Sequence, residues 1–211
     1  MTQPSPPRRR FLARVLGVAG VSLLARPLAR PAQAALLTPR QTEGPYYPEP
    51  SMRRADIDND LVRVAGAVRR AGGEIVRLTG HVRDADGTPV EGARVEIWQC
   101  DAQGNYMHPR DRRSANHDAD FQGFGHDITG PDGRYAFRTI KPVPYPGRTP
   151  HIHVKVFTAG RQLTTQFYIA GEPSNMRDGI FRRLSEAERA AVEMRFEPGE
   201  NAPQAQVDIT V

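Results

Sequence analysis

The chain has 211 residues, 38% of them hydrophobic, and it contains 19 Gly and 19 Pro. This length suits one substantial domain with a buried core, and the many turn-forming residues favour short strands over long helices. The chain has 29 basic and 24 acidic residues and a net charge of +5. Residues 1–34 hold six Arg and no acidic residue, so the remaining residues include 23 basic and 24 acidic ones. This near-neutral remainder gives no support to a surface for nucleic acid.

The first 34 residues have the layout of an export signal. A basic cluster at 8–10 precedes an apolar stretch at 15–24, and an Ala-Gln-Ala sequence ends at Ala34. The apolar stretch is too short for a membrane-spanning helix. The paired arginines, followed by Arg-Phe-Leu, favour the twin-arginine route, which exports folded proteins. We therefore expect residues 1–34 to be removed and the protein to be periplasmic or secreted, without a membrane anchor. An ordinary Sec signal and a membrane anchor are the alternatives.

The next segment, residues 35–72, is expected to be extended and to dock on the core. It contains TEGPYYPEP, where Pro45, Pro48 and Pro50 exclude a regular helix. The main domain is expected to span residues 73–211.

Short strands dominate this domain. A capping-box spacing of Ser185 and Glu188 predicts a single helix over 184–196. The combination predicts an all-β fold, a β-sandwich of mixed topology with long active-site loops and one late short helix. Alternation and turn signals place the strands at 74–83, 94–100, 134–140, 151–158, 163–169 and 204–211, with a hairpin turn across 159–162.

Residues 142–154, PVPYPGRTPHIHV, carry the strongest chemical signal. His151 and His153 project from the same face of a strand, and stiff prolines hold Tyr145 close by. A His-x-His pair alone is a weak signal, because two surface histidines can share a face. Tyr106, which ends the tight turn DAQGNY, adds a second phenol at the rim of a neighbouring strand. Because deprotonating a phenol requires a strongly polarising ion, two tyrosines and two histidines together favour Fe(III) over zinc.

Several motifs resemble one family. The runs EGPYYP, GTPVEGARVEIWQCDAQGNY, DGRYAFRTIKPVPYPGRTPHIHVKV and LTTQFY are similar to the intradiol ring-cleavage dioxygenases, specifically the protocatechuate 3,4-dioxygenase-like branch and its β-subunit. The similarity covers residues 42–172. It implies a catechol-type substrate and O2, cleavage of the ring between its two hydroxylated carbons, and a muconate-type diacid as product. A homo-oligomer is left open.

The resemblance also implies a set of site residues. Non-haem Fe(III) would be held by Tyr145 and His151 as axial ligands and by Tyr106 and His153 as equatorial ligands. Tyr145 would also act as a base, Arg148 would stabilise negative charge on the ring, and Gln166 would orient the substrate. The loop PGRTP after Tyr145 is shorter than the family pattern, which puts the family's loop residues for a substrate carboxylate in doubt.

Two other classes of protein compete with this interpretation. GHVRDADGTPVEGARVEIW also resembles transthyretin-like or carboxypeptidase-regulatory modules, which are non-catalytic β-sandwiches that bind partners. A cupin-like Fe(II) oxygenase would use His-x-His with a carboxylate, not two phenols.

Residues outside the motif set are assigned to structure. Tyr46 and Tyr47 are expected to pack against the sandwich rather than over the pocket mouth, and Trp98 is expected in the core. His81 is expected in a strand with a satisfied ring. His108 and His117 are expected in a solvated loop and His126 at the surface, with contact to the substrate or to the site residues left as the alternative.

Overall fold

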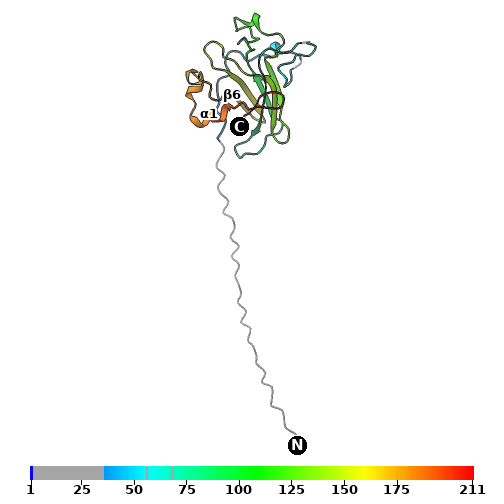
Figure 1. Cartoon of the computed structure of the whole chain (residues 1–211), viewed down its shortest axis with the longest axis vertical. Helices are drawn as coiled ribbons and strands as arrows, with labels where there is room; N and C mark the ends of the chain where they lie inside the picture. Colours follow the sequence, from blue (N-terminus) through cyan, green and yellow to red (C-terminus); the bar gives the residue numbers. More distant parts are fainter. Residues whose placement is uncertain (2–35, 56, 68) are drawn as a thin grey trace. The chain divides into compact units, whose positions relative to one another are not determined.

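The computed structural model describes Met1 and residues 36–211, except residues 56 and 68. The predicted export signal therefore lies outside the described residues, apart from Met1. Residues 36–211 belong to one compact unit (Figure 1).

Two sheets of mixed topology form this unit, which confirms the predicted all-β sandwich. Within the first sheet, the central strand runs antiparallel to one neighbour and parallel to the other two. Its order is β4 (Arg134–Ile140), β1 (Ile75–Arg83) and β8 (Gln204–Gln206), with β9 (Ile209–Thr210) also paired to β1. The second sheet has the order β3 (Phe124–Ile128), β2 (Arg94–Trp98), β5 (His151–Thr158), β6 (Arg161–Ile169) and β7 (Glu193–Met194).

The main core collects the aliphatic side chains of both sheets. Strand β5 supplies Ile152, Val154 and Val156, all fully buried, and its alternate residues point to the opposite face. Six consecutive residues of β5 are buried, which shows that the opposite face is covered as well. The cover is a segment that we call the N-terminal arm, residues 36–55. Its backbone bonds to β6 through Gln41 N, which donates to Thr164 O at 2.8 Å.

The single α-helix in the described part of the chain is shorter than the sequence predicts. It spans Glu186–Val192 (α1), and the predicted capping box of Ser185 and Glu188 is present. The helix ends early because Glu193 and Met194 pair with β6 as β7. With seven residues, α1 falls far short of the length that crosses a lipid bilayer. In Figure 1 it lies beside β6, which it contacts. Four short 3-10 helices complete the elements: η1 (Pro50–Met52), η2 (Ser114–Asn116), η3 (Asn175–Arg177) and η4 (Phe181–Arg183).

The strand predicted at 94–100 ends at Trp98, and two further boundaries differ from the sequence prediction for local reasons. The predicted last strand is split into β8 and β9, because the carboxylate of Asp208 accepts the hydrogen bond of His81 N, which interrupts the ladder. The predicted four-residue hairpin turn is a two-residue turn, since Thr158 pairs with Arg161. Sequence patterning missed β3, whose FGHDI segment contains Gly and Asp and lacks a clear alternation.

Candidate metal centre

Strand β5 presents His151 and His153 on the face that the N-terminal arm covers. Both side chains are buried, with 1% exposure each. His151 Nδ1 lies 2.7 Å from Thr149 O, so Nδ1–H is the donor and Nε2 carries the acceptor lone pair of the ring. The Nε2 atoms of the two rings lie 3.1 Å apart. This separation suits two ligands at about 2.0–2.1 Å from one ion.

Burial keeps both rings neutral. It lowers the pKa of His151 to about 3, with a further contribution from the Arg148 charge, and it lowers the pKa of His153 well below its ordinary value. Neutral imidazole is the form that binds metals, so no proton has to leave these rings when an ion binds.

Two phenols complete the cluster. The rings of Tyr106 and Tyr145 meet edge to face with centroids 5.4 Å apart. The Tyr145 ring is 5.4 Å from that of His151, and the Tyr106 ring is 6.4 Å from that of His153. Burial raises the pKa of both phenols, and raises that of Tyr106 most clearly. The structure therefore brings together all four residues that are predicted as ligands from the sequence.

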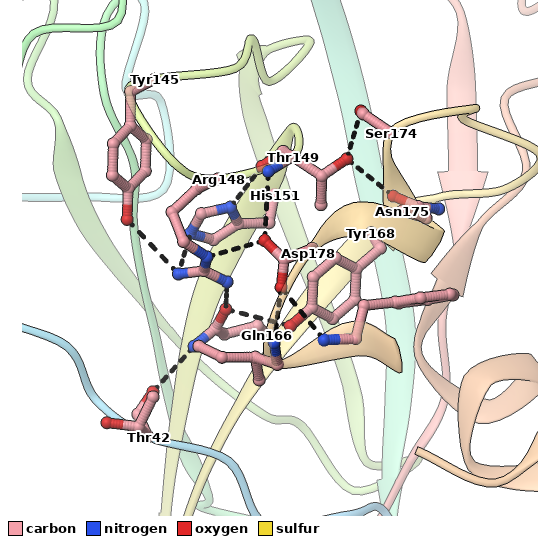
Figure 2. A network of polar contacts seen from close by, with 12 residues as sticks. Thr42, Tyr145, Arg148, Thr149, His151, Gln166, Tyr168, Ser174, Asn175 and Asp178 are labelled. Carbon is pink, nitrogen blue, oxygen red and sulfur yellow. Dashed lines mark hydrogen bonds and ion pairs between the residues drawn. The ribbon is translucent and has the colours of Figure 1, made fainter. Parts of the chain in front are cut away.

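Arg148 lies at the centre of the polar network in Figure 2. Its Nη1 is 3.4 Å from the Tyr145 hydroxyl and 3.3 Å from His151 Nε2. Its Nη2 donates to Gln166 Oε1 at 2.5 Å. The guanidinium thus reaches two of the four ligand candidates and the predicted substrate-orienting amide.

Asp178 holds this arginine in place, although no sequence pattern predicts a role for it. Its Oδ2 accepts from Arg148 Nε at 2.8 Å and from Thr149 N at 3.1 Å. Burial alone would raise the pKa of Asp178, but the Arg148 hydrogen bond and two backbone N–H groups outweigh it, so the pKa is lowered. Asp178 directly follows η3, and no sequence spacing links it to Arg148, 30 residues earlier.

The N-terminal arm supplies a second group of contacts. Gln166 Nε2 donates to Thr42 O at 2.8 Å, and Tyr168 Oη donates to Gln41 Oε1 at 2.6 Å. Gly44 has φ +73°, and a Cβ at this position would lie 3.3 Å from His153 Cε1. The arm therefore approaches the His153 ring at a position where only glycine fits without strain.

Tyr46 differs from its predicted position, whereas Trp98 is buried in a hydrophobic core cluster, as predicted. Tyr46 stacks on Tyr106 with centroids 4.5 Å apart, so it lies at the site rather than against the sandwich. Tyr47 does pack on the sheet, against Trp98 at 4.9 Å. Trp98 is buried outside the main core and stacks on His153 at 4.8 Å with an interplanar angle of 8°. Aromatic stacking thus holds both Tyr106 and His153.

The other histidines have separate surroundings. His81 lies 3.3 Å from Asp208, and the His117 ring is 6.2 Å from that of Phe121. His126 lies opposite Glu96 in the ladder of β2 and β3. His108 is not the solvated loop residue that was predicted, because it is 5% exposed and meets Tyr46 edge to face at 5.8 Å.

The donor set fits a ferric ion. Within the described residues, no group of three or more His, Cys, Asp or Glu side chains is placed to hold a metal ion. The Tyr106 hydroxyl and His153 Nδ1 are buried without a hydrogen-bond partner among those residues. A buried polar atom without a partner is costly, and a bound cation would satisfy the phenol oxygen. Deprotonating phenols of raised pKa requires a hard, highly charged ion such as Fe(III).

Comparison with known proteins places the chain in a family. A sequence profile of a family described as Dioxygenase matches residues 42–210. The protocatechuate 3,4-dioxygenase beta chain of Burkholderia cepacia is 40% identical over 149 residues, which cover 66% of this chain and 63% of that protein. A hydroxyquinol 1,2-dioxygenase of Nocardioides simplex is 35% identical over 159 residues, covering 65% of this chain and 49% of that protein. The chain thus matches about half to two thirds of the length of these relatives.

Comparison with solved structures also finds dioxygenases. The dioxygenase domain of a dioxygenase–carbohydrate-binding fusion from Streptomyces sp. SirexAA-E superimposes with a TM-score of 0.63 at 32% identity, covering 83% of this chain and 97% of that one. An intradiol ring-cleavage dioxygenase from Tetranychus urticae gives a TM-score of 0.65 at 24% identity, covering 83% and 94%, which supports the shared fold. The chain belongs to the intradiol ring-cleavage dioxygenase family.

Proposed function

We propose that this protein is a non-haem Fe(III)-dependent intradiol dioxygenase. It cleaves a catechol-type ring between the two hydroxylated carbons with O2 and yields a muconate-type diacid. One observation carries the proposal: two imidazoles and two phenols converge in a buried cluster, and the guanidinium of Arg148 lies within 3.4 Å of two of them.

The chain's residues have distinct roles in this reaction. When bound, Fe(III) would supply the positive charge that holds a deprotonated catechol and would draw electron density from the ring, which favours its reaction with O2. As a phenolate, Tyr145 Oη takes a proton from a substrate hydroxyl. The residues that would hold the ion are Tyr106, Tyr145, His151 and His153.

Arg148 and Gln166 act on the substrate. Arg148 is held in place before substrate binds, because its Nε is bonded to Asp178 and its Nη2 to Gln166. A fixed positive charge stabilises negative charge on the ring without reorganisation during the reaction. Gln166 is anchored at both ends of its amide, by Arg148 and by Thr42 O, so it can orient a bound ring.

Metal analysis and oxygen uptake test the proposal. Purified protein loaded with iron should bind one ferric ion per chain, show a wine-red phenolate-to-Fe(III) absorption, and consume O2 with at least one member of a panel of catechols. Zinc as the bound metal, no bound metal, or no oxygen uptake with any catechol in the iron-loaded protein would contradict it. A non-catalytic binding module or an Fe(II) site would be nearly colourless.

We also propose that the protein is exported by the twin-arginine pathway and works without a membrane anchor once residues 1–34 are removed. Support comes from the arginine pair Arg8 and Arg9, the short apolar stretch and the Ala-Gln-Ala sequence. Cell fractionation should find the mature chain outside the cytoplasm. Replacing both arginines by lysine should retain the precursor inside, and continued export would point to the Sec route.

A further inference from the structure

The face of β5 that lies under the N-terminal arm carries a third buried polar residue besides His151 and His153. This residue is Lys155, which strand alternation places on the same face as the two histidines. Its side chain is 9% exposed. A buried lysine is uncommon unless a partner holds its charge, so the contacts of Lys155 indicate its role.

Lys155 contacts the N-terminal arm on both sides of Gly44. Its Nζ forms an ion pair with the carboxylate of Glu43, and it lies 4.0 Å from the centroid of the Tyr47 ring. A cation over the face of an aromatic ring is attracted by the ring as well as by the carboxylate. One ammonium group therefore fastens residues 43–47 of the arm to β5.

A second carboxylate, that of Glu96, lies on the strand next to Lys155 but has other partners. Glu96 is opposite Lys155 in the ladder of β2 and β5. Its carboxylate accepts from the Tyr47 hydroxyl and from Arg94 Nε, each at 2.7 Å. The charge of Lys155 is thus paired with the arm through Glu43.

The orientation of the His153 ring depends on packing, and the arm is part of that packing. His151 Nδ1 is bonded to Thr149 O, whereas His153 Nδ1 has no hydrogen-bond partner among the described residues. A metal-ligating histidine is usually oriented by such a bond at its second nitrogen. Around His153, Trp98 stacks on the ring at 4.8 Å and Gly44 approaches Cε1. An arm that is held in place at Gly44 therefore limits rotation of the ring.

We propose that Lys155 and Glu43 are positioning residues: their ion pair holds the N-terminal arm against the His153 ring and so keeps the ring in the orientation that retains the ferric ion. The inference rests on the proposed function of this site. The arm has further attachments, since Gln41 N donates to the backbone of β6 at 2.8 Å. Loss of the ion pair therefore loosens residues 43–47 without detaching the whole arm.

Iron release from the loaded protein to a chelator tests this. Lys155→Met keeps the aliphatic stem and removes the charge, and Glu43→Gln removes the opposite charge. Each variant should release iron about fivefold faster than the wild type, a smaller effect than the loss of a group bonded directly to a ligand. Because both act through one ion pair, the double variant should be no faster than either single variant. The ferric electron paramagnetic resonance signal, which reports ligand geometry, should broaden in all three.

A matched variant and a metal-free measurement serve as controls. Lys141→Met breaks the ion pair of Lys141 and Glu74, 3.3 Å apart next to the ends of β4 and β1 in the other sheet, and should leave iron release and the ferric signal unchanged. Without metal, amide hydrogen exchange in residues 41–47 should be faster in Lys155→Met and Glu43→Gln than in the wild type, while exchange in β1 stays the same. Glu43 is the more exposed partner, so its variant tests the pair even where loss of the buried lysine affects folding.

The outcomes separate the two proposals. If the wild type binds no ferric ion, the proposed function fails. If the wild type binds iron but Lys155→Met and Glu43→Gln release it at the wild-type rate, or if their effects add in the double variant, the iron centre stands and the positioning inference is wrong.

Discussion

Asp178 and Arg148 form a buried ion pair at the candidate metal centre, with Asp178 Oδ2 2.8 Å from Arg148 Nε. The side-chain exposures are 0% and 15%. The same carboxylate binds Thr149 N, and Thr149 O in turn holds the His151 ring. One aspartate thus orients both the charge that faces the substrate and the loop that leads into the histidine pair.

Asp178→Asn should destabilise the protein in a pH-dependent way. Leaving Arg148 without its charged partner should lower the free energy of unfolding at pH 7 by about 2–4 kcal/mol. The pKa of Asp178 is lowered in the folded state, so its contribution is present above the unfolded pKa near 3.8 and is lost as pH falls through the folded value. Urea unfolding at pH 7 and at about pH 3 should show the gap between wild type and variant shrinking. An equal gap at both pH values would contradict this account.

Gly44→Ala should weaken metal binding while the fold persists. The left-handed backbone at Gly44 and the 3.3 Å approach to His153 Cε1 both oppose a methyl group. The variant should lose about 1–2 kcal/mol of stability and bind iron about tenfold more weakly. Gly171→Ala is the matched control, because φ there is +72° and a Cβ would meet nothing within 4 Å. Equal iron affinity in the two variants would show that the contact with His153 has no effect.

Tyr145→Phe and Tyr106→Phe should each change the colour of the iron-loaded protein. Each removes one of the two phenols whose charge transfer to Fe(III) would give the visible absorption. The band should shift and weaken in both variants, as recorded by absorption spectroscopy. Tyr46→Phe is the control, because Tyr46 stacks on Tyr106 without belonging to the proposed ligand set. A spectrum that changes as much in the control would show that packing, not ligation, sets the colour.

Trp98 should report metal occupancy by fluorescence. It is the single tryptophan of the chain, and it stacks on His153 at 4.8 Å. A coloured ferric centre held by His153 would quench the indole emission by energy transfer, so titration with Fe(III) should reduce the signal to a stoichiometric end point. The His153→Ala variant should keep most of its emission through the same titration. Undiminished emission in an iron-loaded wild type would place the metal elsewhere.

Local sequence patterns determined much of this molecule. Strand β5 begins and ends where alternation placed it, at His151–Thr158, and the Ser185 and Glu188 capping box starts α1 as expected. The ligand candidates could also be predicted from local sequence, since the Gly-Asn-Tyr turn, the proline-fixed Tyr145 and the His-x-His pair are each recognisable within a few residues. Periodicity and turn chemistry are short-range properties, so the sequence alone carries them.

Only the tertiary structure decided what surrounds those residues. Three contacts join segments that no local pattern links. Arg148 bonds to Asp178, 30 residues later in the chain. Gly44 of the N-terminal arm approaches His153, and Tyr46 stacks on Tyr106. Contacts of this kind are set by how two sheets and the N-terminal arm pack, and packing depends on the whole chain at once.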